Sequence, residues 1–248
     1  MQLDNYKISI IMQSFLGDYT YSRTDSVNKF KRAVNSFLNQ INDNCELIIV
    51  SDGCQTTVDT YNKFFKQYEK IKCIFVEKKD IKMYDTIQNE LYYRGFPRQC
   101  GLDIAIGSII AYMDSDDFLL PNFTEIILDC YLKYPNDYHW FVNQSWYDNI
   151  NTKYDKYYTD FFEPNYETKC VIEGLDSEWV KIEPKISETV NFQPWTLTHL
   201  KSCGVEWEDT IGVSEDIHFT RKLIDKYYGI LYNSPCYVRC HLKGVYDF

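Results

Sequence analysis

The chain has 248 residues, 45% of them hydrophobic, which is enough for one sizeable α/β domain or for two halves that share a core. Its 26 Lys and Arg residues against 36 Asp and Glu residues give a net charge of −10, which argues against a nucleic-acid-binding protein and against docking on an anionic membrane by charge alone. No apolar run approaches the roughly 20 residues of a membrane-spanning helix, and the polar N-terminus predicts no signal peptide. Nine scattered cysteines with no C-x-x-C indicate reduced thiols, so we expect a cytoplasmic protein.

The first half of the chain alternates short apolar runs with amphipathic stretches. Residues 7–12 are predicted to form a buried strand, and residues 27–41 a helix, because the apolar side chains of the latter recur at helical spacing. A second buried strand is expected at 46–50, a second helix at 58–68 and a third strand at 73–76. This order of strands and helices predicts a parallel sheet with right-handed crossovers.

The second half continues this pattern and then becomes more polar. A short helix ended by Gly107 leads into the apolar run 108–113, which is typical of a buried strand. A further helix is expected from Pro121, and a strand over 138–146. The polar stretch 148–190 is expected to mix strands with long loops. The last predicted elements are a helix from Ser214 through Asp225 and a closing strand over 229–238.

Three carboxylates, those of Asp114, Asp116 and Asp117, follow the predicted strand at 108–113. Like charges that lie this close repel one another, so the cluster needs a cation or must hold a proton. In an open α/β sheet, ligands bind in the crevice beyond the carboxyl ends of the strands. An Asp-x-Asp pair in that place indicates a divalent metal that holds a phosphate-bearing ligand, and an acidic surface turn is the alternative.

Further candidate site residues stand where other predicted elements begin or end. Because the carboxyl ends of parallel strands meet at one edge of a sheet, we expect several of them near the three carboxylates. For the acidic candidates there are also purely structural explanations: an acid can belong to a turn that ends a strand, or it can stabilise the start of a helix by its charge. The candidates are Gln13, Ser14 and Phe15 after the first strand, Asp52 after the second, Arg98 in the helix before Gly107, and Glu215 and Asp216 after Ser214.

Several stretches of the chain, taken together, resemble family 2 glycosyltransferases with the GT-A fold. The resemblance implies one α/β domain with a mixed, mainly parallel sheet flanked by helices, in which residues 1–120 bind a nucleotide-sugar and residues 121–248 shape the acceptor site. The matching stretches come in the order expected for that family: I-S-I-I-M-Q-S-F (8–15), a helix that ends near Gln40, E-L-I-I-V-S-D-G (46–53), P-R-Q-C-G-L-D-I-A-I-G-S-I-I-A-Y-M-D-S-D-D (97–117) and S-E-D-I-H-F (214–219).

The resemblance also implies how the nucleotide is bound. Gln13, Ser14 and Phe15 would line the nucleobase pocket, where many relatives carry a Thr and a Tyr in place of Gln13 and Phe15. Asp52 would accept a hydrogen bond from a ring N–H of the base. Arg98 would lie near the nucleotide and its phosphates as a fixed cation.

Metal binding and proton transfer are implied in the same way. Asp116 would ligate Mn²⁺ or Mg²⁺, which hard carboxylate oxygens suit, and Asp114 would hold the ribose or reach the metal through water. His241 would be a third metal ligand or, as is more usual for a histidine near a C-terminus, a surface residue. Asp216 would be the general base, with Glu215 orienting it or binding the acceptor.

These roles imply a metal-dependent, inverting glycosyltransferase of polysaccharide biosynthesis. It would move a sugar from a nucleotide-diphosphate donor, by default a UDP-sugar with dTDP and GDP as alternatives, to a hydroxyl group of a glycan or other acceptor. One rival is a non-catalytic GT-A-like domain that binds a saccharide or a partner. A second is a sugar nucleotidyltransferase, which usually has a Gly-rich basic loop that this chain lacks after its first strand. Trp207, in the acceptor half, is expected either to stack on a sugar or to pack in the core.

Overall fold

The structure, a computed structural model, describes residues 6–17, 25–77, 91–92, 95–133, 139–149, 152–158, 179–182, 197–211 and 215–239. No helix within these ranges has the length and apolar character that crossing a membrane requires. The α-helices in these ranges are α1 (Ser26–Leu38), α2 (Gln55–Phe64), α3 (Gly95–Ile104), α4 (Phe123–Lys133) and α5 (Glu215–Ile224).

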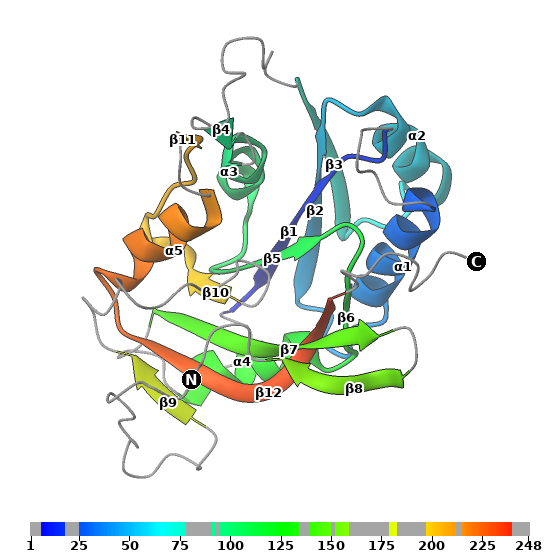
Figure 1. Ribbon diagram of the computed structural model, residues 1–248. Helices are drawn as coiled ribbons and strands as arrows, with labels where there is room; N and C mark the ends of the chain where they lie inside the picture. The colour runs from blue at the N-terminus through cyan, green and yellow to red at the C-terminus, as the bar shows by residue number, and fades with distance from the viewer. Residues whose placement is uncertain are drawn as a thin grey trace.

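Parallel strands form the first part of the sheet (Figure 1). β1 (Ile8–Ser14) pairs with β2 (Cys45–Asp52) on one side and with β5 (Ile109–Asp114) on the other, and β3 (Ile71–Val76) pairs with β2. In the chain, α1 lies between β1 and β2, and α2 between β2 and β3, so the predicted alternation and the parallel sheet are confirmed. The carboxyl ends of these strands therefore meet at one edge.

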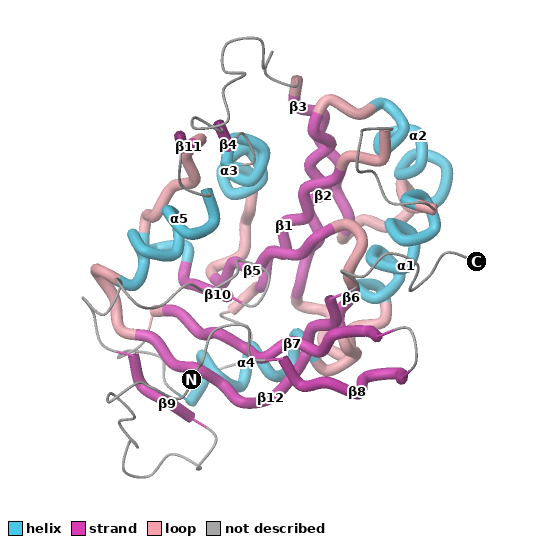
Figure 2. Tube along the Cα trace, in the orientation of Figure 1, coloured by secondary structure: helices cyan, strands magenta, loops and turns pink. Residues whose placement is uncertain are grey.

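The sheet continues from β5 into the second half of the chain without a break (Figure 2). β10 (Leu197–Leu200) lies antiparallel between β5 and β7 (Trp140–Asn149), and β7 runs parallel to β12 (Gly229–Arg239). The mixed sheet flanked by helices that we expected is thus confirmed. The other strands are β6 (Phe118–Leu119) and β9 (Trp179–Ile182), both antiparallel to β12, β8 (Thr152–Tyr158), antiparallel to β7, and the two-stranded ribbon of β4 (Leu91–Tyr92) and β11 (Thr210–Ile211).

Apolar cores lie on both faces of the sheet, because successive side chains of a strand point to opposite sides. On β5, Ile109 and Met113 belong to the core that includes residues of α1 and α4, whereas Ile110 and Tyr112 belong to the core that includes residues of α3 and α5. Figure 1 shows α1 and α2 on one side of the parallel strands and α3 and α5 on the other. By the same alternation, Asp114 belongs to the face covered by α3 and α5.

The helix α3 approaches the sheet closely at Gly101. A Cβ atom at this position would lie 2.6 Å from Ile11 Cγ2 and 3.0 Å from Val50 Cγ2, so a larger residue would push the helix away from β1 and β2. Arg98 precedes Gly101 by one turn, and its Nη2 atom lies 3.7 Å from Asp114 Oδ1. The close packing at Gly101 therefore helps to hold Arg98 beside the end of β5.

Candidate functional site

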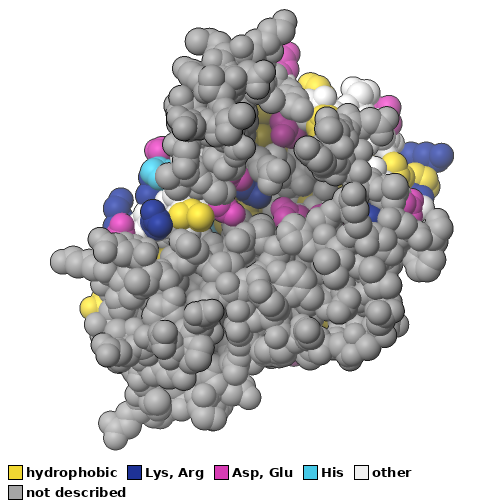
Figure 3. All heavy atoms as spheres, viewed as in Figure 1, with side chains coloured by type: hydrophobic (Ala, Val, Ile, Leu, Met, Phe, Trp, Pro, Cys, Tyr) yellow, Lys and Arg dark blue, Asp and Glu magenta, His cyan; other side chains and the backbone are white. Residues whose placement is uncertain are grey.

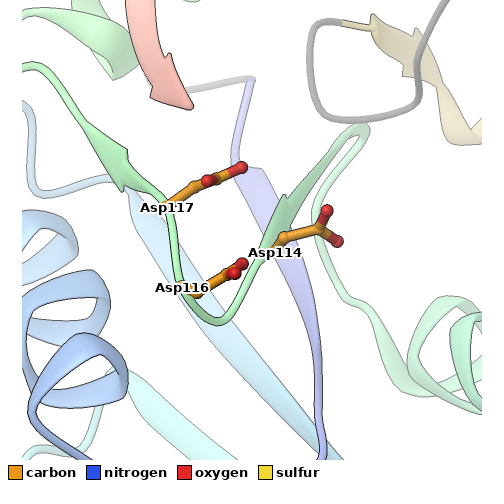
Figure 4. A group of neighbouring side chains, drawn as sticks. All are labelled: Asp114, Asp116 and Asp117. Atoms are coloured by element: carbon orange, nitrogen blue, oxygen red, sulfur yellow. The ribbon is translucent and has the colours of Figure 1, made fainter. Parts of the chain in front are cut away.

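The three carboxylates predicted to cluster lie together at the turn between β5 and β6 (Figure 4). Asp114 ends β5, and the N–H of Asp117 donates to the Asp114 carbonyl over 3.3 Å, which closes the turn around Asp116. One carboxylate oxygen of each residue lies within 4.8 Å of the others. The Asp114 side chain is 36% exposed, whereas Asp117 is only 4% exposed, so Asp114 and Asp116 form the accessible side of the cluster.

This cluster suits a hard divalent cation. Carboxylate oxygens are the ligands that Mg²⁺ and Mn²⁺ prefer, and three neighbouring negative charges repel one another unless a cation lies among them. The structure brings together Asp114 and Asp116, which were predicted as metal ligands, with Asp117, the third acid of the predicted cluster. His241, the other predicted ligand, lies outside the described residues.

Tyr237 on β12 holds the turn from one side, although no sequence pattern indicated it as a site residue. Its hydroxyl accepts the Asp114 N–H over 3.0 Å and donates to Asp117 Oδ2 over 2.8 Å. Tyr237 is fully buried, and this burial, followed by the charges of Asp117 and Asp114, raises its pKa well above the ordinary value. The phenol therefore keeps its proton and remains a donor to Asp117.

The helix α1 holds the same turn from the other side. The Arg32 guanidinium donates to the main-chain carbonyl of Asp116, and it lies over the ring of Phe118 with 5.2 Å between the guanidinium carbon and the ring centroid. Four residues later on α1, Ser36 Oγ accepts the N–H of Leu119 over 3.0 Å. The acidic turn is thus clamped between α1 and β12, which explains how three like charges are kept in one place.

Gln13 and Asp52 meet beside the acidic turn, on the face covered by α3 and α5. Gln13 Nε2 donates to Asp52 Oδ2 over 3.0 Å, and Gln13 lies opposite Asp114 in the register of β1 and β5. Gly53 has φ +63°, a left-handed conformation that lets the chain turn directly after Asp52. Among the described residues, no donor reaches the buried Gln13 Oε1. The edge of the sheet therefore presents an amide and a carboxylate next to the acidic cluster.

The other two residues predicted for the nucleobase pocket lie differently. Ser14 is 1% exposed, and its Oγ lies 3.3 Å from Thr57 Oγ1 of α2, on the opposite face of the sheet from Gln13. Strand alternation requires this difference, because Ser14 follows Gln13 directly. Phe15 is half-buried against the core on the α1 side, and its ring covers Gly17 so closely that a Cβ there would lie 2.8 Å from Phe15 Cζ.

Arg98 is buried between two carboxylates that come from different elements. Its Nη1 lies 2.8 Å from Glu215 Oε1 at the start of α5, in addition to the contact with Asp114. Asp216, the next residue, is more exposed than Glu215, and its Oδ1 accepts the N–H of Ile217 over 2.7 Å. In the view of Figure 3, which is that of Figure 1, acidic side chains are visible near the middle of the molecule with basic side chains beside them. The structure thus connects Glu215, Arg98 and Asp114 directly.

Trp207 packs in the core rather than against solvent, which confirms one of its two expected roles. It is 3% exposed, and its Nε1 donates to Tyr112 Oη over 2.8 Å. The indole stacks on Phe219 of α5 with 4.1 Å between ring centroids and 4° between planes. Its ring also lies 4.8 Å from the guanidinium carbon of Arg98. Trp207 is therefore part of the scaffold beneath the site.

Comparisons with known sequences point to one family. Residues 20–177 match the family model described as Glycosyl transferase family 2. Over 110 residues the chain is 31% identical to the putative glycosyltransferase EpsH of Bacillus subtilis (strain 168), a match that covers 44% of this chain and 26% of that protein.

Solved structures agree on the fold. The structure of S. aureus TarS 1–349 in complex with UDP-GlcNAc matches with a TM-score of 0.65 at 15% identity, over 96% of this chain and 59% of that chain. A TarS 1–349 complex with UDP matches with a TM-score of 0.60 at 14% identity, over 94% of this chain and 60% of that chain. These likenesses confirm the GT-A fold. The chain spans less than two thirds of the length of either TarS chain and about a quarter of EpsH.

Proposed function

Because the chain belongs to glycosyl transferase family 2, we propose that it is a metal-dependent, inverting glycosyltransferase that moves a sugar from a nucleotide-diphosphate donor to a hydroxyl group of a saccharide acceptor. The observation that carries this proposal is the cluster of Asp114, Asp116 and Asp117 at the edge of the sheet where Gln13 and Asp52 also lie. Ligands of open α/β sheets bind at that edge, and a carboxylate cluster there suits the cation that accompanies a diphosphate.

The two more exposed acids of the cluster would hold Mn²⁺ or Mg²⁺. Asp116 and Asp114 face solvent, whereas the buried Asp117 accepts a hydrogen bond from Tyr237 and would keep the turn in shape. The bound cation would stabilise the negative charge that develops on the departing diphosphate. Arg32 and Tyr237 would keep the carboxylates in place before the donor arrives, so that little reorganisation is needed on binding.

The nucleotide would lie along the ends of β1 and β2. Gln13 and Asp52 offer amide and carboxylate groups that pair with the hydrogen-bonding edge of a nucleobase, and Phe15 would flank the base. Ser14 would contribute through its main chain, because its hydroxyl faces Thr57 of α2. The S. aureus TarS structure in complex with UDP-GlcNAc makes this compound the first donor to test.

Asp216 is the proposed general base. The acceptor oxygen would attack the anomeric carbon on the side opposite the diphosphate, while its proton passes to the Asp216 carboxylate. The bond between the anomeric carbon and the phosphate oxygen would break, and its electron pair would leave with the diphosphate. A single displacement of this kind inverts the anomeric centre. The partly exposed position of Asp216 in the first turn of α5 supports this role.

Nucleotide binding tests the site directly. Melting temperatures should be measured with UDP, GDP, dTDP and CMP, each with and without Mn²⁺, because a ligand that binds only the folded state raises the melting temperature. We expect a rise that requires both a nucleotide and Mn²⁺, and we expect Asp116→Asn to abolish it. Asp129→Asn on α4, where the native side chain is 60% exposed, is the control and should keep the rise. A nucleotide-induced rise in the wild-type melting temperature that is the same with and without Mn²⁺ would contradict the proposed metal site.

Turnover tests the reaction. UDP release from UDP-GlcNAc should be followed with a panel of saccharide acceptors, and Asp216→Asn should lower kcat by about 100-fold or more while leaving the nucleotide-induced melting shift intact. Pyrophosphate release from a sugar 1-phosphate and a nucleoside triphosphate would instead identify a nucleotidyltransferase. Saccharide binding without any turnover would identify a non-catalytic domain.

A further inference from the structure

Arg98 joins two parts of the proposed site that are far apart in the chain. Arg98 is 6% exposed and Glu215 is 3% exposed, so both belong to the interior. A buried guanidinium is tolerated only where carboxylates and hydrogen bonds replace its lost water. Glu215 supplies an ion pair of 2.8 Å from α5, and Asp114 supplies one of 3.7 Å from the end of β5. In this position Arg98 has little surface left to contact a diphosphate, and Glu215 has little left for an acceptor.

The indole of Trp207 strengthens the connection between Arg98 and α5. The indole contacts both the Arg98 guanidinium and the ring of Phe219, on which it stacks. Phe219 follows Glu215 by one turn of α5. The main-chain N–H of Trp207 also donates to the side chain of Gln99, next to Arg98, over 2.7 Å. The helix α5 therefore contacts Arg98 in two ways. Glu215 forms the ion pair directly, and Phe219 packs on Trp207, whose ring lies against the guanidinium.

Building on the proposed function, we propose that Arg98 and Glu215 are positioning residues whose ion pair holds the first turn of α5, and with it Asp216, at a set place relative to Asp114. The guanidinium is planar and permanently charged, so it fixes the direction as well as the distance of the carboxylates it binds. Asp216 follows Glu215 directly, and Asp114 belongs to the metal cluster. The pair thus aligns Asp216, the proton acceptor, with the metal cluster that holds the sugar donor. A small misplacement of catalytic groups lowers the reaction rate strongly.

The test removes the two charges singly and together. Arg98→Met leaves Glu215 buried beside an apolar side chain, and Glu215→Met removes the closest partner of Arg98, so each should lower the melting temperature by roughly 10 °C. The double variant R98M/E215M replaces the pair by apolar side chains of similar size and should regain most of this loss. Its kcat should nevertheless stay at least about 10-fold below wild type, with the donor KM within about threefold.

A second ion pair at the opposite end of the sheet provides the matched control. Lys72 Nζ lies 2.8 Å from Glu46 Oε2, and the Glu46 side chain is 2% exposed. Glu46 lies at the beginning of β2, whereas the site lies at its end. K72M/E46M should change the melting temperature and leave kcat within about twofold of wild type. Only the carboxylate of this control pair is buried, because the Lys72 side chain is 44% exposed. The control therefore separates the loss of an ion pair at a buried carboxylate from the loss of the pair that touches α5.

Hydrogen exchange gives a readout that does not depend on turnover. In R98M/E215M, the amides of residues 217–224 on α5 should exchange at least about 10-fold faster than in wild type, whereas those of α2 should not change. If wild-type protein transfers no sugar from any donor, the proposed function fails, and the exchange rates still test the connection. A double variant with turnover within about twofold of wild type, or with unchanged exchange in α5, would overturn the proposal. A rise in donor KM at unchanged kcat would also overturn it, because Arg98 would then act on the donor itself.

Discussion

Tyr237 ties the acidic turn together through one oxygen atom. The same hydroxyl accepts the Asp114 amide and donates to the Asp117 carboxylate, so residues on either side of Asp116 share one partner. A hydrogen bond to a carboxylate is stronger than one between neutral groups, and inside the protein it also favours the charged form of the acid. A residue near the end of the chain thereby fixes acids that belong to its first half.

We predict that Tyr237→Phe lowers the free energy of unfolding by roughly 1 to 3 kcal/mol, because two buried hydrogen bonds are lost and no new cavity is created. The same change should raise the Mn²⁺ concentration required for nucleotide binding, since Asp114 loses the anchor of its main chain. Urea unfolding measures the first effect, and melting temperatures over a Mn²⁺ titration measure the second.

Tyr61→Phe is the matched control, because Tyr61 Oη donates to the main-chain carbonyl of Ile71 over 3.2 Å and connects α2 to β3. It should reduce stability without changing the Mn²⁺ requirement. If Tyr237→Phe also left the Mn²⁺ requirement unchanged, the hydroxyl would only stabilise the fold and would not shape the metal site.

The helix α1 supports the acidic turn with one polar stripe. Arg32, Ser36 and Gln40 are spaced by four residues, which places them on one side of the helix and its extension. All three bond to the chain around and after the acidic turn. Gln40 Nε2 donates to the carbonyl of Leu120 over 2.9 Å, and its Oε1 accepts the N–H of Thr124 over 3.1 Å. The same helix therefore packs its apolar side on the sheet and uses polar side chains to hold the segment that carries the acids.

Gln40→Met should lower the free energy of unfolding by about 2 kcal/mol, because the buried N–H of Thr124 and the partly buried carbonyl of Leu120 lose a partner while the side-chain volume is kept. Gln67→Met tests the same substitution at an exposed position, where the native side chain donates to the carbonyl of Phe64 and to no other group of the described residues. It should change stability by less than about 0.5 kcal/mol. Equal effects in a urea titration would contradict a supporting role for the α1 stripe.

Local patterns predicted the regular elements well and the pairing of short strands poorly. The helix expected at 27–41 is Ser26–Leu38, and the strand expected at 46–50 is Cys45–Asp52. The spacing of their apolar residues predicts these elements correctly, because each element buries one face or both in the structure. The strand Leu197–Leu200 was missed, since four residues carry too little periodicity and its antiparallel pairing with β5 depends on residues far away in the chain.

The candidate site was predictable where topology alone brings residues together. Asp52 and Asp114 end parallel strands and Gln13 is the last residue but one of a third, so their meeting at one edge follows from the strand order. Arg32 and Tyr237 carry no such signal, because Arg32 is one polar residue of an amphipathic helix and Tyr237 is one of 22 tyrosines. They contact the acids across 84 and 120 residues of chain. Only the packing of the complete fold reveals these partners.

A chain of hydrogen bonds crosses the core between the sheet and α5. Trp207 Nε1 donates to Tyr112 Oη, which lies 3.0 Å from His199 Nε2, and His199 Nδ1 lies 3.0 Å from the carbonyl of Leu200. Because a carbonyl can only accept, Nδ1 carries the proton and Nε2 accepts the Tyr112 hydroxyl. Burial lowers the pKa of His199 to about 4, so its imidazole is neutral at pH 7.

This histidine makes the stability of the whole fold sensitive to acid. In the unfolded chain His199 takes up a proton below about pH 6.5, whereas in the folded chain it does so only near pH 4. Between these values the unfolded state binds more protons, so the free energy of unfolding falls as the pH falls from about 6.5 to about 4. The full loss from this one group is roughly 3 kcal/mol.

The variant His199→Gln isolates this contribution. At about pH 7.5 it should be less stable than wild type, because the bonds to Tyr112 and Leu200 are weakened or lost. At about pH 4.5 this deficit should shrink by roughly 2 kcal/mol, since only the wild-type chain gains a proton at position 199 on unfolding. Urea unfolding of both proteins at the two pH values measures the change, and carboxylates that titrate in both cancel in the difference. A deficit that is the same at both pH values would contradict a buried, neutral His199.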